Sequence, residues 1–201
     1  MSKIRRICVY CGSSPGTDPA FAAAAHEFGA IMARNGVGLV YGGGAIGIMG
    51  AISQSMLDHG GEVIGIIPEF LMARERALHG AHELIVTADM HERKRKMFEL
   101  ADAFVTLPGG VGTLEEIVEQ MTWAQLGRHK KPILLASING FWEPLCALLE
   151  HMKALQFIRA DLNFNLLMAN QVSDILPMLQ EAVAKVPEEA TRMEPTAAER
   201  L

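Results

Sequence analysis

Short, almost wholly apolar segments alternate along this chain with longer amphipathic stretches, and this alternation restricts the fold more than any other feature. Strands are expected at residues 4–10, 37–41, 63–67, 83–87, 103–107, 133–137 and 166–169. Their apolar residues form continuous runs, which is typical of strands covered on both faces. Helices are expected at residues 18–35, 46–59, 90–101, 113–126, 141–155 and 173–186. This order predicts an α/β fold with a doubly wound parallel sheet flanked by helices.

The length and the composition fit one domain with a sizeable core. The chain has 201 residues, of which 50% are hydrophobic and 20% are charged. We expect a single domain over residues 1–186 and a polar C-terminal tail over residues 187–201. The net charge of −5 argues against a nucleic-acid partner, which would require a basic face. A small anionic ligand is compatible with this charge, because one pocket can be locally positive.

The three cysteines do not suggest a disulfide framework, so a cytoplasmic location is expected. The N-terminus lacks the apolar segment of a signal peptide, and no apolar run approaches the ~20 residues of a membrane-spanning helix. No membrane partner is therefore expected. Cys8 and Cys11 form a C-x-x-C motif, but residues three apart on a strand face opposite sides. Since no second pair completes a zinc site, packing within the strand is the favoured interpretation.

The first of two glycine-rich loops spans residues 41–50 and follows an expected strand. Its Gly42, Gly44 and Gly47 have the G-x-G-x-x-G spacing of dinucleotide-binding proteins. The acidic residue that should follow about 20 residues later would be Glu62, which precedes the next strand instead of ending it. We therefore do not interpret the loop as an NAD site. Tight packing of a strand–helix turn would explain the same glycines.

The second glycine-rich loop spans residues 107–116 and is the more informative one. Its free backbone amides can bind an anion at the start of the helix that follows. Thr113 can cap this helix and also offer its hydroxyl group to a phosphate. Thr113 and Glu116 fit a capping box, which would give Glu116 a structural role. Alternatively, Glu116 faces a part of the ligand that becomes positively charged, such as a ribose ring.

Four consecutive basic residues, 93–96, stand out in this acidic chain. Pairing of Glu92 with Lys96 along one helix face accounts for part of the cluster. Arg93 and Lys94, however, fall in the first turn of the expected helix, where cations oppose the helix dipole. Local rules of this kind tend to fail at functional sites, and the guanidinium group of Arg93 suits phosphate.

These motifs resemble those of the Lonely Guy (LOG) family, the cytokinin riboside 5′-monophosphate phosphoribohydrolases. The resemblance rests on PGGVGTLEE at residues 108–116, MHERK at 90–94, the glycine loop at 42–50 and TWAQLG at 122–127. It extends from about residue 7 to residue 186. It implies a Rossmann-like fold, a homodimer and neither a metal nor a redox cofactor. Some relatives are labelled lysine decarboxylases, but no lysine here lies in a setting suited to a pyridoxal Schiff base.

The resemblance also implies functions for individual residues. Arg93 and Glu116 match the catalytic pair of the family. The matching substrate-binding set is Glu75, Arg93, Lys94, Gly110, Val111, Gly112, Thr113, Leu114, Glu115, Glu116 and Thr122. The implied partner is a small-molecule nucleoside 5′-monophosphate. The implied reaction hydrolyses the N-glycosidic bond of N6-modified adenosine 5′-monophosphates and releases a free base, the cytokinin, and ribose 5-phosphate.

Three other interpretations stay open at this point. The enzyme could be a general nucleosidase that accepts purine or pyrimidine nucleoside 5′-monophosphates. The same fold could hold a nucleotide or a cofactor without cleaving it, as related carrier proteins do. A protein that acts mainly through its dimer face, with Trp123, Phe141 and Trp142, is a third interpretation. Glu116 favours an enzyme, because a pure phosphate binder gains nothing from a carboxylate at that place.

Overall fold

The computed structural model describes residues 4–72, 82–158 and 166–185. At its centre lies a parallel sheet of β1 (Arg6–Tyr10), β2 (Gly38–Tyr41), β3 (Val63–Pro68), β4 (Glu83–Thr87), β5 (Ala103–Thr106), β6 (Ile133–Ala136) and β7 (Leu166–Ala169). The strand order is β4-β3-β2-β1-β5-β6-β7, and every neighbouring pair is parallel. Each strand overlaps one expected from the sequence, so the predicted parallel sheet is confirmed.

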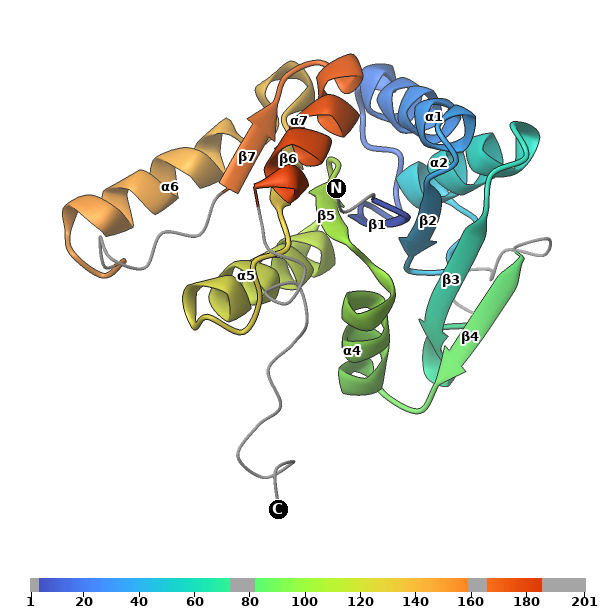
Figure 1. Ribbon diagram of the computed structural model, residues 1–201, viewed down its shortest axis with the longest axis horizontal. Helices are drawn as coiled ribbons and strands as arrows, with labels where there is room; N and C mark the ends of the chain where they lie inside the picture. The colour runs from blue at the N-terminus through green and yellow to red at the C-terminus, as the bar shows by residue number, and fades with distance from the viewer. Residues whose placement is uncertain (1–3, 73–81, 159–165, 186–201) are drawn as a thin grey trace.

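The α-helices of the described residues also overlap the predicted ones (Figure 1). They are α1 (Pro19–Arg34), α2 (Gly47–Asp58), α4 (Met90–Leu100), α5 (Val111–Gln125), α6 (Glu143–Ala154) and α7 (Val172–Ala184). Asp18 is the N-cap of α1, since its carboxylate accepts a hydrogen bond from the Ala20 backbone N–H at 2.9 Å. None of the helices in these ranges is long and apolar enough to cross a bilayer. The predicted tail, 187–201, lies outside the described residues.

Helix α5 begins earlier than the sequence predicts. Its first residue is Val111 and its N-cap is Gly110, whose backbone is extended (φ −93°, ψ −157°). Thr113 therefore lies inside the first turn, and no side chain caps the helix. The predicted cap and the predicted capping box of Thr113 and Glu116 are thus wrong. The error arises because Val111 and Gly112, which look like turn residues, already have helical backbone conformation.

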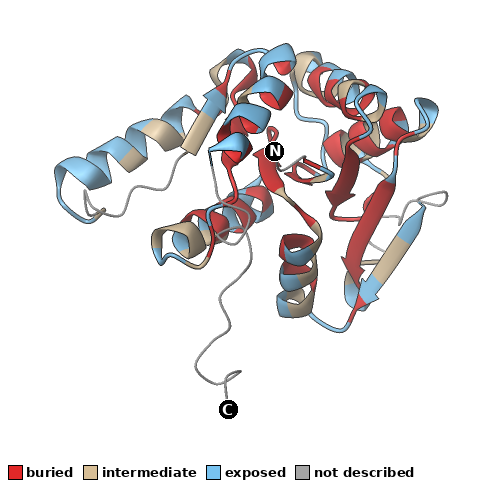
Figure 2. Cartoon of the chain, viewed as in Figure 1, coloured by how far each residue is buried: buried red, intermediate tan, exposed pale blue. Residues whose placement is uncertain are grey.

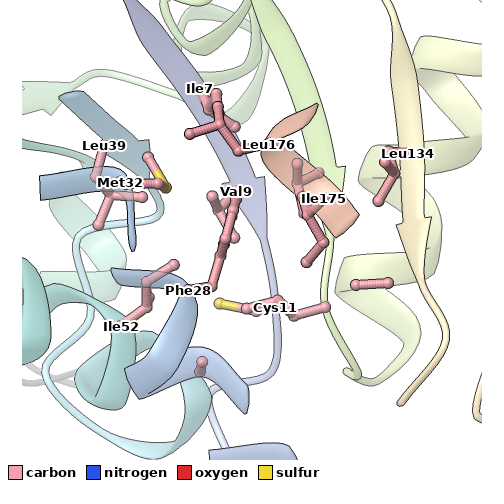
Figure 3. Packing of buried hydrophobic residues seen from close by; sticks show 14 of the residues in the cluster. Ile7, Val9, Cys11, Phe28, Met32, Leu39, Ile52, Leu134, Ile175 and Leu176 are labelled. Atoms are coloured by element: carbon pink, nitrogen blue, oxygen red, sulfur yellow. The ribbon is translucent and has the colours of Figure 1, made fainter. Parts of the chain in front are cut away.

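Helices cover both faces of the sheet, and each face has its own apolar core (Figure 2). Helices α1, α2 and α7 pack on one face, where Figure 3 shows Ile7, Val9, Cys11, Phe28, Met32, Leu39, Ile52, Leu134, Ile175 and Leu176. Helices α4 and α5 pack on the other face through Met97, Phe98, Ile117 and Met121. Burial of β1 in both layers explains why its sequence is apolar at every position except its first.

Cys8 and Cys11 belong to opposite cores, as their spacing on a strand predicts. Cys8 packs in the core beneath α4 and α5, whereas Cys11 packs in the core beneath α1 and α2. Burial raises the pKa of the Cys8 thiol, which disfavours the thiolate that metal binding or redox chemistry would require. Among the residues that the structure describes, no cluster of three His, Cys, Asp or Glu side chains could hold a metal ion.

The strand order reverses between β1 and β5. After β4, at one edge of the sheet, the chain returns through α4 to β5, which pairs with the central β1. The loops after β1 and β5 are joined by a hydrogen bond from the Gly12 N–H to the Pro108 carbonyl at 3.1 Å. In open α/β sheets, ligands bind at such a reversal, outside the carboxyl ends of the strands.

Candidate active site

A cavity of about 220 Å³ lies at the carboxyl ends of the central strands. Its lining comes from the end of β1 and the loop after it, the β2–α2 connection, α2, α4 and the start of α5. The residues are Val9, Cys11, Gly12, Ser13, Gly42, Met49, Arg93, Gly110, Val111, Gly112, Thr113 and Glu116. Both glycine-rich loops and the basic helix, which are far apart in the sequence, therefore contribute to one cavity.

Arg93 and Glu116 form an ion pair in the cavity. Nη1 of Arg93 lies 3.3 Å from Oε1 of Glu116, and the two side chains are only 8% and 10% exposed. Arg93 comes from the first turns of α4, and Glu116 comes from the second turn of α5. The two residues predicted to be the catalytic pair are thus in contact. An ion pair shielded from water in this way acts more strongly on a ligand than one on the surface.

Contacts on three sides hold the guanidinium group of Arg93. Its Nε donates a hydrogen bond to the Ile66 carbonyl of β3 at 3.1 Å, and Nη1 approaches Sδ of Met90 at 3.8 Å. On the third side lies Gly42. A β-carbon at residue 42 would collide with Nη2 of Arg93. The first glycine loop therefore contributes empty space for an arginine, which explains one of its glycines better than dinucleotide binding does.

The start of α5 presents backbone N–H groups to the cavity. Gly110, Val111, Gly112 and Thr113 all line it, and the first turn of a helix leaves its amides without intrahelical partners. Such amides, together with the helix dipole, are suited to binding an anion. Gly109 lies against this turn, and a β-carbon there would collide with the side chain of Thr113. Gly109 thus allows the close approach of the second loop to α5, whereas a β-carbon at Gly110 or Gly112 would meet nothing within 4 Å.

Several residues of the predicted substrate-binding set lie elsewhere. Lys94, Leu114, Glu115 and Thr122 do not line the cavity. The hydroxyl group of Thr122 donates a hydrogen bond to the Val118 carbonyl on the exposed side of α5. Glu75 lies outside the described residues, so its predicted role stays a prediction.

The predicted site set lacks six lining residues: Val9, Cys11, Gly12, Ser13, Gly42 and Met49. All except Gly42 and Met49 belong to the end of β1 and the loop that follows it. The residues at the end of β1 could have been predicted from topology, because the first strand of a doubly wound sheet is central and its carboxyl end lies at the reversal of strand order. Met49 is the methionine of the G-x-M-G sequence, whose packing role only the structure reveals.

The fold and the cavity define a doubly wound α/β protein whose ligand site lies at the reversal of strand order. A family model described as "Possible lysine decarboxylase" matches residues 49–179. The chain is 44% identical over 182 residues to "Cytokinin riboside 5′-monophosphate phosphoribohydrolase LOG" of Oryza sativa subsp. japonica, covering 90% of this chain and 75% of that one. It is 41% identical over 184 residues to LOG1 of Arabidopsis thaliana, covering 92% and 86%. The chain therefore belongs to the LOG family.

Solved structures support the same fold. The molybdenum cofactor carrier protein of Chlamydomonas reinhardtii has a TM-score of 0.68 and 22% identity, with 91% of this chain and 100% of that one covered. The molybdenum cofactor binding protein of Rippkaea orientalis has a TM-score of 0.66 and 19% identity, with 91% and 99% covered. At these identities the likeness establishes a shared Rossmann-like architecture and no shared ligand.

Proposed function

We propose that this protein hydrolyses the N-glycosidic bond of N6-modified adenosine 5′-monophosphates and releases the free base and ribose 5-phosphate. One observation carries the proposal: the buried pair of Arg93 and Glu116 lines the same cavity as the amides at the start of α5. Curated relatives at 41–44% identity are named for this reaction. The cavity thus combines an anion site with a carboxylate, which a simple phosphate carrier would not need.

In this proposal the phosphate binds to the amides of residues 110–113 and to the hydroxyl group of Thr113. The ribose then extends along α5 towards Glu116, which lies one turn further into the helix. The carboxylate would repel the phosphate but would stabilise a positive charge at C1′. The glycosidic bond breaks through an oxocarbenium-like state, as in other glycoside hydrolyses, so the carboxylate favours the transition state over the ground state.

Glu116 also orients or deprotonates the water that attacks C1′. Arg93 holds Glu116 in place through the 3.3 Å contact. Its guanidinium group is a fork of donors, so the N–H groups that are not turned towards Glu116 or Ile66 can meet the phosphate or the departing base. A contact with the base would partly neutralise the negative charge with which the base leaves, whereas a contact with the phosphate would hold the substrate in place.

A pyridoxal-dependent decarboxylation, which the description of the family model suggests, finds no support in the described lysines near the site. Lys94 is bound to two carboxylates, and Lys131 donates a hydrogen bond from Nζ to the Phe98 carbonyl at 2.6 Å. Neither lines the cavity. A Schiff base requires a neutral amine that faces the substrate.

We also propose a homodimer in the cytoplasm. The exposed side of α5 and its C-cap carry four apolar residues: Val111, Leu114, Val118 and Leu126. Exposed apolar residues that recur along one helix are typical of a contact between subunits. The cytoplasmic location fits the three cysteines, which form no disulfide.

The function is tested with a substrate panel. AMP, N6-prenylated AMP, GMP, CMP and UMP are incubated with the protein, each beside its nucleoside, and the free base is quantified by chromatography. We expect hydrolysis of the adenine nucleotides, fastest for the prenylated one, and little hydrolysis of nucleosides. Equal rates on all five nucleotides would indicate a general nucleosidase instead of an enzyme specific for N6-modified adenine nucleotides. Binding without release of base would identify a carrier.

A further inference from the structure

A second set of ion pairs joins α4 to α5 directly beside the first. Nζ of Lys94 lies 2.7 Å from Oε1 of Glu115 and 2.9 Å from Oε1 of Glu119. Both contacts are also hydrogen bonds, and the Lys94 side chain is only 10% exposed. Charge-assisted hydrogen bonds from one ammonium group to two carboxylates fix the lysine head more firmly than a single surface pair would.

The charges around Lys94 do not suit a phosphate. One ammonium group faces two carboxylates, so the net charge of these three groups is −1. An approaching phosphate would be repelled. Burial alone lowers the pKa of Lys94, but its hydrogen bonds to Glu115 and Glu119 outweigh burial and raise the pKa above its ordinary value. The lysine is therefore charged throughout the physiological range, and its charge is already neutralised.

The helical geometry separates Lys94 from the cavity. Successive helical residues project about 100° apart, so Arg93 and Lys94 leave α4 in different directions. Arg93 lines the cavity and Lys94 does not. On α5, Glu115 and Glu119 are four residues apart and share one side of the helix, while Glu116 lines the cavity. Each helix thus has a residue of the reactive pair immediately next to a residue of the second contact.

We propose that Lys94 is a positioning residue that locks α4 against α5, instead of a phosphate ligand. The lock fixes the separation and the relative rotation of the two helices. It thereby sets the 3.3 Å contact between Arg93 and Glu116, which belong to neighbouring positions on the same two helices. This inference rests on the function proposed above, and it assigns Glu119 the same role as Lys94.

The test compares kcat and KM for hydrolysis of prenylated AMP in four single variants. Lys94→Met keeps the length of the side chain and removes its charge, and Glu119→Gln removes one acceptor charge. Lys94→Arg retains a charged donor for both carboxylates and should rescue activity. Lys96→Met is the matched control, because it removes a lysine of the same helix whose pair, with Glu92, is long (3.8 Å) and partly exposed.

Positioning predicts that Lys94→Met and Glu119→Gln both lower kcat about tenfold or more and leave KM within about threefold, since a misplaced group slows the chemical step. Lys94→Arg and Lys96→Met should stay close to the wild type. Phosphate binding predicts the opposite for one variant: Glu119→Gln would release the ammonium group and lower KM. A lower KM in Glu119→Gln, or a tenfold higher KM with unchanged kcat in Lys94→Met, overturns the inference.

Two further measurements keep the result decisive. If Lys94→Met does not fold, because two carboxylates then face each other, the double variant Lys94→Met/Glu119→Gln removes that repulsion and is compared with Glu119→Gln alone. Residues that act as one unit are not additive, so a lock predicts little further loss of kcat in the double variant. The wild-type rate separates the two proposals: an inactive wild type overturns the function itself, whereas an active wild type with fully active variants overturns only the lock.

Discussion

Arg93 occupies the space that a side chain at residue 42 would fill. The variant Gly42→Ala should therefore displace the guanidinium group, since a β-carbon would collide with Nη2 and lie 3.1 Å from Sδ of Met49. A displacement of about 1 Å in an active site can cost about 10²-fold in rate. We expect a loss of that size in kcat/KM for the prenylated nucleotide, with a melting temperature near that of the wild type.

A second comparison checks whether residue 42 acts through the arginine. Gly42→Ala should add little to the loss caused by Arg93→Ala, because both changes remove the same guanidinium group from its place. A full additional loss in the double variant would show that Gly42 contributes through the backbone of its loop instead.

Glu116 is the residue whose charge the proposed mechanism requires. Glu116→Gln keeps the shape of the side chain and removes the charge that stabilises the oxocarbenium-like state. We expect kcat to fall by about 10² or more, with a smaller change in KM. Steady-state kinetics on AMP and prenylated AMP measure both values. Turnover near the wild-type rate would exclude Glu116 from catalysis. A control with Glu150→Gln, an exposed carboxylate of α6, separates this effect from a general loss of acidic charge.

The sequence predicted that Arg93 and Glu116 belong to one site but did not predict all of its surroundings. Glu116 and Arg93 stood out because each violates a local preference, a carboxylate beside an anion site and a cation at a helix start. Lys94 violates the same preference, yet its ammonium group is satisfied by Glu115 and Glu119 on another helix. Residue types along one chain do not reveal which cation faces the ligand and which faces a carboxylate. That difference depends on the packing of α4 against α5.

At the level of elements, His129 connects the C-terminal half of α5 to the loop before β6. Its Nε2 lies 3.3 Å from the Gln120 carbonyl, and its Nδ1 accepts a hydrogen bond from the Lys131 backbone N–H at 3.2 Å. The ring packs against Phe98 and Phe104 and is 2% exposed. This arrangement requires a neutral imidazole with its proton on Nε2, because an N–H group occupies the lone pair of Nδ1.

This histidine makes the stability of the fold depend on acidity. Burial lowers the pKa of His129 to about 4, from the 6.5 of an exposed histidine. Below pH 6.5 His129 binds a proton in the unfolded chain but stays neutral in the folded chain. The free energy of unfolding therefore falls as the pH falls towards 4. The loss should reach about 2 to 3 kcal/mol at pH 4.5. Urea denaturation at pH 7 and pH 4.5 measures it.

The control for this titration is His129→Gln, which cannot ionise. Its free energy of unfolding should change less between the two pH values than that of the wild type, by about the same 2 to 3 kcal/mol. An equal acid sensitivity in both proteins would assign the effect to carboxylates elsewhere in the chain.

At the level of the whole molecule, the apolar side of α5 predicts how copies of the chain associate. Val118→Asp and Leu126→Asp place charges within this surface and should convert a dimer into monomers, as measured by light scattering during size-exclusion chromatography. Leu148→Asp is the matched control, because Leu148 is also an exposed apolar residue but lies on α6. A monomeric wild type, or dissociation by the α6 variant alone, would contradict the proposed interface.

The architecture was more predictable than the site because apolar periodicity is a property of single segments. A strand that is buried on both faces has apolar side chains at consecutive positions, as β1 does, and this pattern can be read from the sequence. The strand order leaves no such pattern, nor does the contact of the β1 loop with the β5 loop through Gly12 and Pro108. Those features depend on contacts between residues about 100 positions apart, which periodicity does not encode.

The return of the chain through α4 affects how the protein refolds. Strands β2, β3 and β4 extend the sheet on one side of β1, whereas β5, β6 and β7 extend it on the other. Arg93 follows the first set and Glu116 follows the first strand of the second set, so neither half of the chain contains both members of this ion pair. Parallel pairing across such sequence distances is slow. After dilution from denaturant, enzymatic turnover should therefore recover later than helical circular dichroism, once β5 has docked beside β1.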